Sequence, residues 1–311
     1  THPAPDYREG FRSDSLSTPE LLGDSSAFSR ISALRVFGRR LLVTDAGSPE
    51  HLVVVDRVSG AVESRFGRHG EGPGEFRDPR WTHHHASDAS LAWVYDYTLR
   101  RLALVRLDGS VRERLVRTLR LDQGPYLSEP VLLGDRFVSN GYFVSHTLTV
   151  ADTQWSSLTH LAGESLTIAT DADPMFRTRL NRTRTAVDPA HSRLVLVFQS
   201  ANRIDIFDSA LRHRGSISGP RDTRVALRTI ETPRGPTTRW SDENELAYVG
   251  VDATNEFIFA LFCGHCGARA LPRRVHVFTW EGRFVSELNL DRSVETIAVS
   301  ADGRTLYGSI D

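Results

Sequence analysis

Hydrophobic residues in this chain fall into short runs, and polar, turn-forming residues separate one run from the next. The runs are rich in Val, Leu, Ile, Phe and Thr, and the separators are rich in Gly, Asp, Asn and Ser. Such runs are typical of β-strands, whereas an amphipathic helix would repeat its apolar residues about every 3.6 positions. No long segment shows that helical period. The pattern therefore predicts an all-β protein.

A single unit recurs along the chain, in which four apolar strands are joined by turns and loops. The turn between its third and fourth strands is the clearest mark, because Asp-Gly and Ser-Gly pairs supply the positive φ that tight hairpins require. The clear copies occupy residues 31–67, 81–116, 185–218 and 246–290, a weaker copy occupies 130–163, and a half copy occupies 295–310. Each full copy predicts a four-stranded antiparallel meander.

A lone meander leaves both of its faces uncovered, whereas radial repetition covers each face with a neighbouring meander, as in a β-propeller. Five copies and a half copy indicate six blades. The ring must close, because open sheet edges would otherwise remain. We therefore expect residues 19–25, with 6–13 beside them, to supply strands that complete the last blade. The chain, residues 1–311, is predicted to be one six-bladed propeller domain, in which residues 1–25 are partly a tether and partly closing strands.

The stretch 66–76, FGRHGEGPGEF, contains four glycines and lies where the chain must pass from the outer strand of one blade to the inner strand of the next. Glycines permit such bends, and the two phenylalanines can anchor both ends in the core between blades. A phosphate-binding loop would need a following helix, but the next residues, RDPRWTHHHAS, have no helical pattern. The stretch is therefore interpreted as a structural junction.

The overlapping stretch GRHGEGPGEFRDP resembles the blade junction of six-bladed propellers of the NHL and TolB-like type. The C-terminal VHVFTWEGRFVSELNLDRSVETIAVSADGRTLYGSI resembles their closing blade and SRISALRVFGRRLLVTD their first blade, whereas residues 125–182 match least. Such propellers include scaffolds, binders of peptides and proteins, and periplasmic or surface modules. Related enzymes include lactonases, esterases and lyases, often with a metal in the central channel. The resemblance implies the fold and leaves the function open.

Composition narrows the range of partners. The formal net charge is −1, although all 38 basic side chains are arginine, so no overall field favours nucleic acid or an anionic membrane. No apolar run approaches the ~18 residues of a membrane span. The chain opens at Thr1, and its first 25 residues are rich in Ser, Pro, Asp and Thr, like a tether that follows an export signal. We therefore expect a periplasmic or secreted, cell-surface protein with a processed or truncated N-terminus.

The innermost strands of a propeller line its central channel, and their first residues surround one mouth. These strands are predicted to begin near Arg30, His83, Glu129, Arg184, Glu245 and Glu295. His83 and His85 would share one face of a strand, which makes them candidates for a catalytic base or for metal ligands. A single divalent ion, Ca or Zn, could then bind in the channel with carboxylates from other blades. Polar residues in a hydrated channel without such a role are the alternative.

Anion binding is the second kind of chemistry that the predicted mouth suggests. Arginine forks bind carboxylate or phosphate groups bidentately, so Arg182 and Arg184, at the start of an inner strand, are candidates. The alternative for the arginines is that they are solvated loop charges, and the alternative for Trp240 is packing between blades. Further ligand-binding candidates at or near this mouth are Arg30, Glu245, Glu295 and Trp240.

The two cysteines of the chain, Cys263 and Cys266, flank a Gly-His pair. A thioredoxin-type site would need a helix after the first cysteine, and Gly267 and Pro272 oppose one. A local disulfide, two free thiols, or a metal site that includes His265 are the remaining interpretations.

These observations predict an extracytoplasmic propeller that binds a small anionic ligand, a peptide or a protein partner at one face of its channel. Nucleic acid is not an expected partner, because no basic stripe is present. One alternative is a channel-site enzyme, a hydrolase or lactonase or a lyase, that uses a metal or a histidine base. The other is a purely structural surface or scaffold protein.

Overall fold

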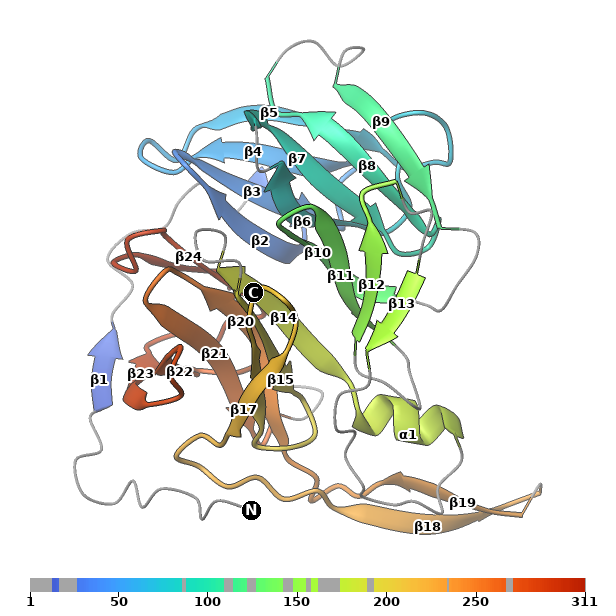
Figure 1. Cartoon of the computed structure of the whole chain (residues 1–311), viewed down its shortest axis with the longest axis vertical. Helices are drawn as coiled ribbons and strands as arrows, with labels where there is room; N and C mark the ends of the chain where they lie inside the picture. The colour runs from blue at the N-terminus through green and yellow to red at the C-terminus, as the bar shows by residue number, and fades with distance from the viewer. Residues whose placement is uncertain are drawn as a thin grey trace.

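The structure is a computed structural model in which the regular secondary structure of the described residues is almost entirely β-strand (Figure 1). It describes residues 13–16, 27–85, 88–108, 114–121, 127–141, 148–154, 158–161, 174–188, 193–233, 235–266 and 271–310, with the backbone alone for 13, 83–85, 89, 158, 160, 161, 174 and 175. The all-β class predicted from the hydrophobic pattern is confirmed.

Four sheets are four-stranded antiparallel meanders whose strands follow one another in chain order. Blades 1 and 2 consist of β2 (Ile31–Phe37), β3 (Arg40–Asp45), β4 (Glu50–Asp56), β5 (Val62–Arg68), β6 (Pro79–His85), β7 (Asp88–Asp96), β8 (Arg101–Arg106) and β9 (Leu115–Arg120). Blades 3 and 4 consist of β10 (Leu127–Leu133), β11 (Arg136–Gly141), β12 (Leu148–Asp152), β13 (Leu158–Leu161), β14 (Thr183–Asp188), β15 (Arg193–Phe198), β16 (Ile204–Phe207) and β17 (His213–Ile217). The weak central repeat, 130–163, is thus a blade like the others.

The fifth blade has an additional strand, and the sixth is shorter. Blade 5 consists of β20 (Leu246–Ala253), β21 (Phe257–Gly264), β22 (Arg274–Thr279) and β23 (Phe284–Leu290), with β1 (Ser13–Leu16) parallel to β23 at its outer edge. The described part of blade 6 is the pair β24 (Ile297–Val299) and β25 (Leu306–Gly308).

The innermost strands form a closed ring. β2 lies beside β6, and the order continues through β10, β14, β20 and β24 before it returns to β2. The middle strands of the blades are buried on both faces because each blade packs against two neighbours; β4, for example, is buried from His51 to Asp56. The last gap is closed by Ala298 of β24, which packs in one cluster with Leu34 of β2 and Val53 of β4. The six-bladed ring predicted from the repeats is therefore confirmed.

The predicted closing strands at 6–13 and 19–25 lie outside the described residues except for Ser13. β1, which begins at the last residue of the segment 6–13, pairs with β23 of blade 5 and not with the sheet of β24 and β25. Its apolar Leu16 lies opposite Leu290, at the outer edge of a complete meander. An exposed sheet edge can pair with any strand whose backbone reaches it. The repeat pattern in the sequence does not distinguish the outer edge of blade 5 from that of blade 6.

The glycine-rich stretch 66–76 joins β5 to β6, as predicted. Phe66 and Phe76 are 3% and 1% exposed and lie in one core cluster with Trp81. Gly67 has a φ of +78°, a conformation that costs other residues steric strain. The Arg101 guanidinium donates to carbonyl oxygens of the stretch, which fixes the junction against blade 2. The stretch is therefore an ordered joint between two blades.

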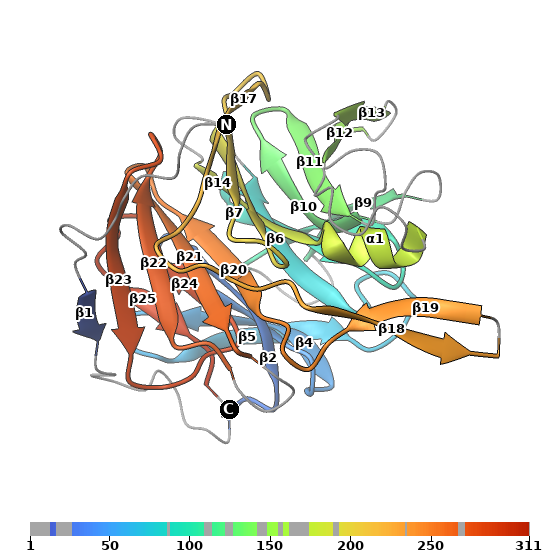
Figure 2. The same ribbon diagram turned by 90° about the horizontal axis from the view of Figure 1, so that it is seen from below.

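Two insertions leave the ring on the same side. One carries helix α1 (Pro174–Leu180), and the other carries the hairpin of β18 (Leu227–Thr232) and β19 (Gly235–Trp240), which projects beyond the blades (Figures 1 and 2). Phe176 of α1 packs on Trp240 with ring centroids 5.1 Å apart, and Leu180 completes the cluster. The two longest interruptions of the repeat therefore form one small accessory layer.

Candidate functional site in the central channel

All six innermost strands contribute to a channel along the axis of the ring. At the end where these strands begin, a pocket is lined by charged residues from four of them and by Glu295, which precedes β24. We call it the inlet pocket. Its charged residues are Arg35, Arg80, Glu129, Arg184 and Glu295. At the end where the strands finish lies a larger space of about 480 Å³, which we call the outlet cavity. Arg35, Trp81, Thr82 and Val131 line both spaces.

Arg184 and Glu129 form an ion pair across the inlet pocket. Arg184 Nη1 donates to Glu129 Oε1, and Arg184 Nε donates to the carbonyl oxygen of Val249 at 3.1 Å. Burial raises the pKa of Glu129, but the charges of Arg184, Arg35 and other nearby arginines lower it by a larger amount. The net shift of the pKa is downward. Glu129 is therefore ionised and neutralises Arg184.

Arg35 and Arg80 supply the remaining positive charge of the inlet pocket. Arg35 Nη1 donates to the carbonyl oxygen of Leu34 at 3.1 Å. Arg80 lies 3.7 Å from the Asp78 carboxylate through one of its terminal nitrogens, while its buried Nε–H has no acceptor among the described residues. A buried donor without an acceptor is costly, so this position favours an acceptor supplied by water or by a ligand.

The outlet cavity is mostly apolar, and Asp252 is its acidic residue. Asp252 Oδ2 accepts the N–H of Val299 at 2.7 Å, and Oδ1 accepts the N–H of Ala253 at 2.9 Å. Burial raises the pKa of Asp252, with partial offset from the Arg35 charge and these two hydrogen bonds. The carboxyl group therefore resists ionisation more than a surface aspartate would.

In blades 1 and 2, an aspartate at the end of the second strand fixes the backbone that leads into the innermost strand, at the inlet end of the channel. Asp45, at the end of β3, is buried and accepts the N–H groups of Ser29 and Arg30 at 3.0 and 2.8 Å. Asp96, at the end of β7, accepts the N–H of Arg77 at 2.7 Å and therefore fixes the approach to β6 in the same way. The sequence signal for these anchors was the recurrence of Asp at the end of an apolar strand, in LLVTD and AWVYD.

The predicted inner strand of blade 2 begins earlier than expected. β6 starts at Pro79 rather than at His83, because the Asp96 anchor acts on the residues just before Pro79. Arg80 consequently takes the place in the inlet pocket that was assigned to a histidine. His83 and His85 lie in the second half of β6, opposite Trp93 and Asp88, and their side chains lie outside the described part of the chain.

The other predicted residues divide into two groups. Arg184 and Glu295 line the inlet pocket. Arg182 directly precedes β14 and accepts the N–H of Gln199 with its carbonyl oxygen. Arg30 is exposed, and its backbone is held by Asp45. Trp240 packs on α1, which is the alternative that the sequence left open.

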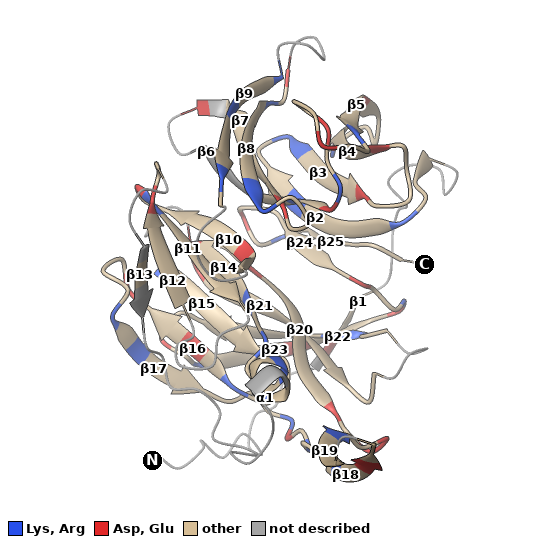
Figure 3. Cartoon of the chain, turned by 90° about the vertical axis from the view of Figure 1, so that its right-hand side faces the viewer, with Lys and Arg blue, Asp and Glu red and all other residues tan. Residues whose placement is uncertain are grey.

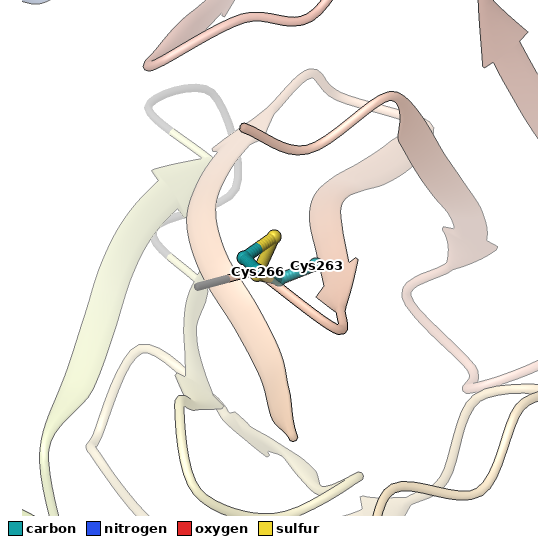
Figure 4. The surroundings of a disulfide bond; sticks show 2 residues. All are labelled: Cys263 and Cys266. Atoms are coloured by element: carbon teal, nitrogen blue, oxygen red, sulfur yellow. A yellow bond between two sulfur atoms is a disulfide. The ribbon is translucent and has the colours of Figure 1, made fainter. Parts of the chain in front are cut away.

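Glu245 belongs to the cysteine loop rather than to the channel. Its Oε1 lies 2.9 Å from His265 Nε2, and its Oε2 accepts the N–H of Arg224 at 2.8 Å. Cys263 and Cys266 are joined by a disulfide at the end of β21 (Figure 4). A zinc site would need thiolate sulfurs, so the expectation of a metal bound by Cys263, His265 and Cys266 is wrong for this oxidised form.

Metal ligation has little support within the described ranges. There, no group of three or more His, Cys, Asp or Glu side chains converges as a metal site would require. The residues that do converge in the inlet pocket are arginines paired with too few carboxylates, a set that fits an anion better than a cation.

A buried network of titratable side chains lies away from the channel, between blades 4 and 5. His276 Nε2 lies 3.1 Å from Glu287 Oε2, and His276 Nδ1 lies 3.1 Å from the Tyr248 hydroxyl. Arg221 completes the network, with its Nη2 donating to Glu287 Oε1 at 2.7 Å. Because Arg221 comes from the long crossing between β17 and β18, the network fastens that crossing to blade 5.

Residues 59–302 match the family described as TolB-like 6-blade propeller-like. This chain belongs to the TolB-like six-bladed propeller family. The part of the earlier resemblance that concerned TolB-like propellers is thereby confirmed. No curated protein matches the sequence.

Solved structures agree with this family at the level of the fold. A member of the duf4221 family from Bacteroides vulgatus has a TM-score of 0.61 at 13% identity, over 92% of this chain and 89% of that one. A protein described as exported, from Bacteroides fragilis, has a TM-score of 0.53 at 12% identity, over 90% and 80%. Kuenenia stuttgartiensis hydrazine synthase has a TM-score of 0.50 at 10% identity, over 91% and 94%. Likeness at such low identity shows the propeller architecture alone.

Proposed function

We propose that this TolB-like propeller binds a small anionic ligand at the inlet end of its central channel. The observation that carries the proposal is the convergence of Arg35, Arg80 and Arg184, from three different blades, in one pocket. On the side of the molecule seen in Figure 3, basic and acidic residues are interspersed. In the inlet pocket, three arginines instead gather at a concave surface, which is the usual shape of a small-molecule site.

Charge balance within the pocket selects two of these arginines. Glu129 neutralises Arg184, and Glu295 lies exposed at the rim. Arg35 and Arg80 remain to bind a ligand. Arg80 also lies 3.7 Å from the Asp78 carboxylate, but its buried Nε–H still has no acceptor among the described residues. A carboxylate or phosphate group satisfies two parallel N–H donors of one guanidinium, which a neutral ligand does less well.

An extracytoplasmic location is part of the proposal. The disulfide between Cys263 and Cys266 supports it, because disulfides persist mainly in oxidising compartments. Among the described residues, no helix has the length and hydropathy needed to cross a membrane. NHL-type repeats, which the blade junction resembles, remain part of the proposal as well.

Calorimetric titration of the purified protein with small carboxylates and inorganic phosphate tests the function. Replacing one guanidinium removes a charge-assisted hydrogen bond, so Arg35→Gln and Arg80→Gln should each weaken binding roughly 10- to 100-fold. Arg120→Gln, an exposed position on the outer strand β9, is the matched control and should bind like the parent. Equal affinity in all four proteins, or no binding of any anion, would exclude the channel as an anion site.

The second candidate function is catalysis in the channel by a hydrolase, lactonase or lyase. Its candidate residues are His83 and His85, which follow Thr82 on β6, and Thr82 lines the outlet cavity. Metal analysis of the purified protein separates the two functions. One tightly bound Ca or Zn ion per chain, lost in His83→Ala and His85→Ala, would favour the enzyme. A protein or peptide partner captured without any channel ligand would favour the scaffold.

A further inference from the structure

The outlet cavity continues from the inlet pocket and differs from it in chemistry. Its volume of about 480 Å³ lies at the ends of the inner strands, where apolar side chains dominate. Examples from four of these strands and the adjoining β3 are Val36, Phe37, Leu42, Val131, Val187 and Val299. The channel is thus charged at one end and apolar at the other.

Arg35 stands at the boundary between the two ends. It lines both spaces, and its charge acts on Glu129 on one side and on Asp252 on the other. The two carboxyl groups differ, because Glu129 is held by Arg184 while Asp252 is held by backbone N–H groups. Burial opposes ionisation of Asp252. Asp252 therefore repels a ligand carboxylate near Arg35 less than a fully ionised aspartate would.

We propose that the channel ligand is a monocarboxylate with a hydrocarbon tail, whose carboxylate binds Arg35 and Arg80 while its tail enters the outlet cavity. This inference rests on the proposed function and specifies its ligand class. The charged end alone would accept any small anion. The adjoining apolar cavity adds a preference for length, because it offers a hydrocarbon tail a surface removed from water.

The size of the cavity sets the scale of that preference. A cavity of about 150 Å³ lined by apolar side chains takes up benzene, and the outlet cavity is about 480 Å³. It therefore has room for a tail of several methylene groups. Each methylene that leaves water should tighten binding about fourfold until the cavity is full.

A series of straight-chain carboxylates, from acetate to dodecanoate, tests the inference on the purified full chain below the concentrations at which they form micelles. We expect affinity to rise about fourfold per methylene and then to level off. Alcohols of the same lengths should bind much more weakly, and Arg35→Gln should weaken the carboxylates to the level of the alcohols.

A narrowing variant adds a second readout. Ala253, on the wall of the outlet cavity, is half-buried, so Ala253→Phe should reduce the affinity for long carboxylates while acetate binds as before. Val116→Phe, at a 48% exposed position on the outer strand β9, is the matched control for adding an aromatic ring. Thermal unfolding of both variants checks that they fold.

The outcomes separate the two proposals. Acetate binding that depends on Arg35, without any gain for longer chains, would overturn the tail assignment and leave the anion site standing. Equal affinities for an alcohol and a carboxylate of the same length would overturn the role of Arg35 in binding the carboxylate. Binding of none of the series would overturn both proposals. Chain-length gains that survive in Ala253→Phe would place the tail outside the outlet cavity and overturn the inference.

Discussion

Replacement of Glu287 by glutamine should destabilise the protein and flatten its acid sensitivity. The Glu287 side chain is 1% exposed, and its two oxygens accept hydrogen bonds from Arg221 and His276. The glutamine in Glu287→Gln keeps the shape and removes the charge. Arg221 and His276 then lose the anion that orients them, and the crossing that carries Arg221 loses its tie to blade 5.

The magnitude follows from the pKa of Glu287. Burial raises that pKa, but hydrogen bonds from Arg221 and His276 outweigh the burial and lower it from 4.5 to about 2. A carboxyl group with a lowered folded-state pKa stabilises the fold above its unfolded pKa, and that stabilisation is lost as the pH falls from 4.5 towards 2. A difference of this size corresponds to about 3 kcal/mol of unfolding free energy at neutral pH.

His276 shifts stability in the same direction. Burial lowers its pKa more than Glu287 raises it, so the folded state favours the neutral ring. The unfolded chain takes up that proton first as the pH falls below about 6.5, which draws the equilibrium towards unfolding. Both groups therefore make the native protein less stable in acid.

Urea unfolding at pH 7, 5 and 3, followed by tryptophan fluorescence, measures the effect. At pH 7 the Glu287→Gln variant should lose about 3 kcal/mol relative to the parent, and the difference should shrink towards pH 3 because the unfolded parent takes up a proton on Glu287 below its unfolded pKa. Glu231→Gln, an exposed position on β18, is the control and should change little at any pH. A variant as stable as the parent at pH 7, or a difference that grows in acid, would refute this account of the network.

Three further changes test the architecture by thermal and urea unfolding. Phe76→Ala empties a fully buried site at the first blade junction and should cost about 3–5 kcal/mol; an unchanged midpoint would mean that the junction does not anchor the blades. Gly219→Ala should destabilise strongly because its Cβ would lie 1.9 Å from the Tyr248 hydroxyl, whereas Gly215→Ala has open space and should be tolerated. Replacing both cysteines by serine should cost at most about 2 kcal/mol, since the disulfide closes a very short loop, and a larger loss would show that the cysteine loop supports the ring.

The candidate site could be anticipated only in part. Arg184 and Glu295 were identified from the sequence because each precedes or starts an inner strand in the repeat. Arg35 and Arg80 were missed, since Arg35 lies mid-strand and Arg80 entered the mouth only because β6 begins at Pro79. Asp252 was missed because a single acidic residue in a strand gives no sign that it faces a cavity.

The sequence by itself determined the all-β class, the repeated four-stranded unit, the number of blades and the role of the glycine-rich junction. These follow from local causes, namely the alternation of apolar runs with turn residues and the backbone freedom of glycine. Only the tertiary structure decided that β1 pairs with β23, that the cysteines form a disulfide and that three arginines meet in one pocket. The strand pairing and the arginine cluster join segments that are far apart in the sequence, and the disulfide depends on the shape of one loop. None of these features leaves a repeating pattern in the sequence. They depend on the radial packing of blades, which fixes which side chains face the axis.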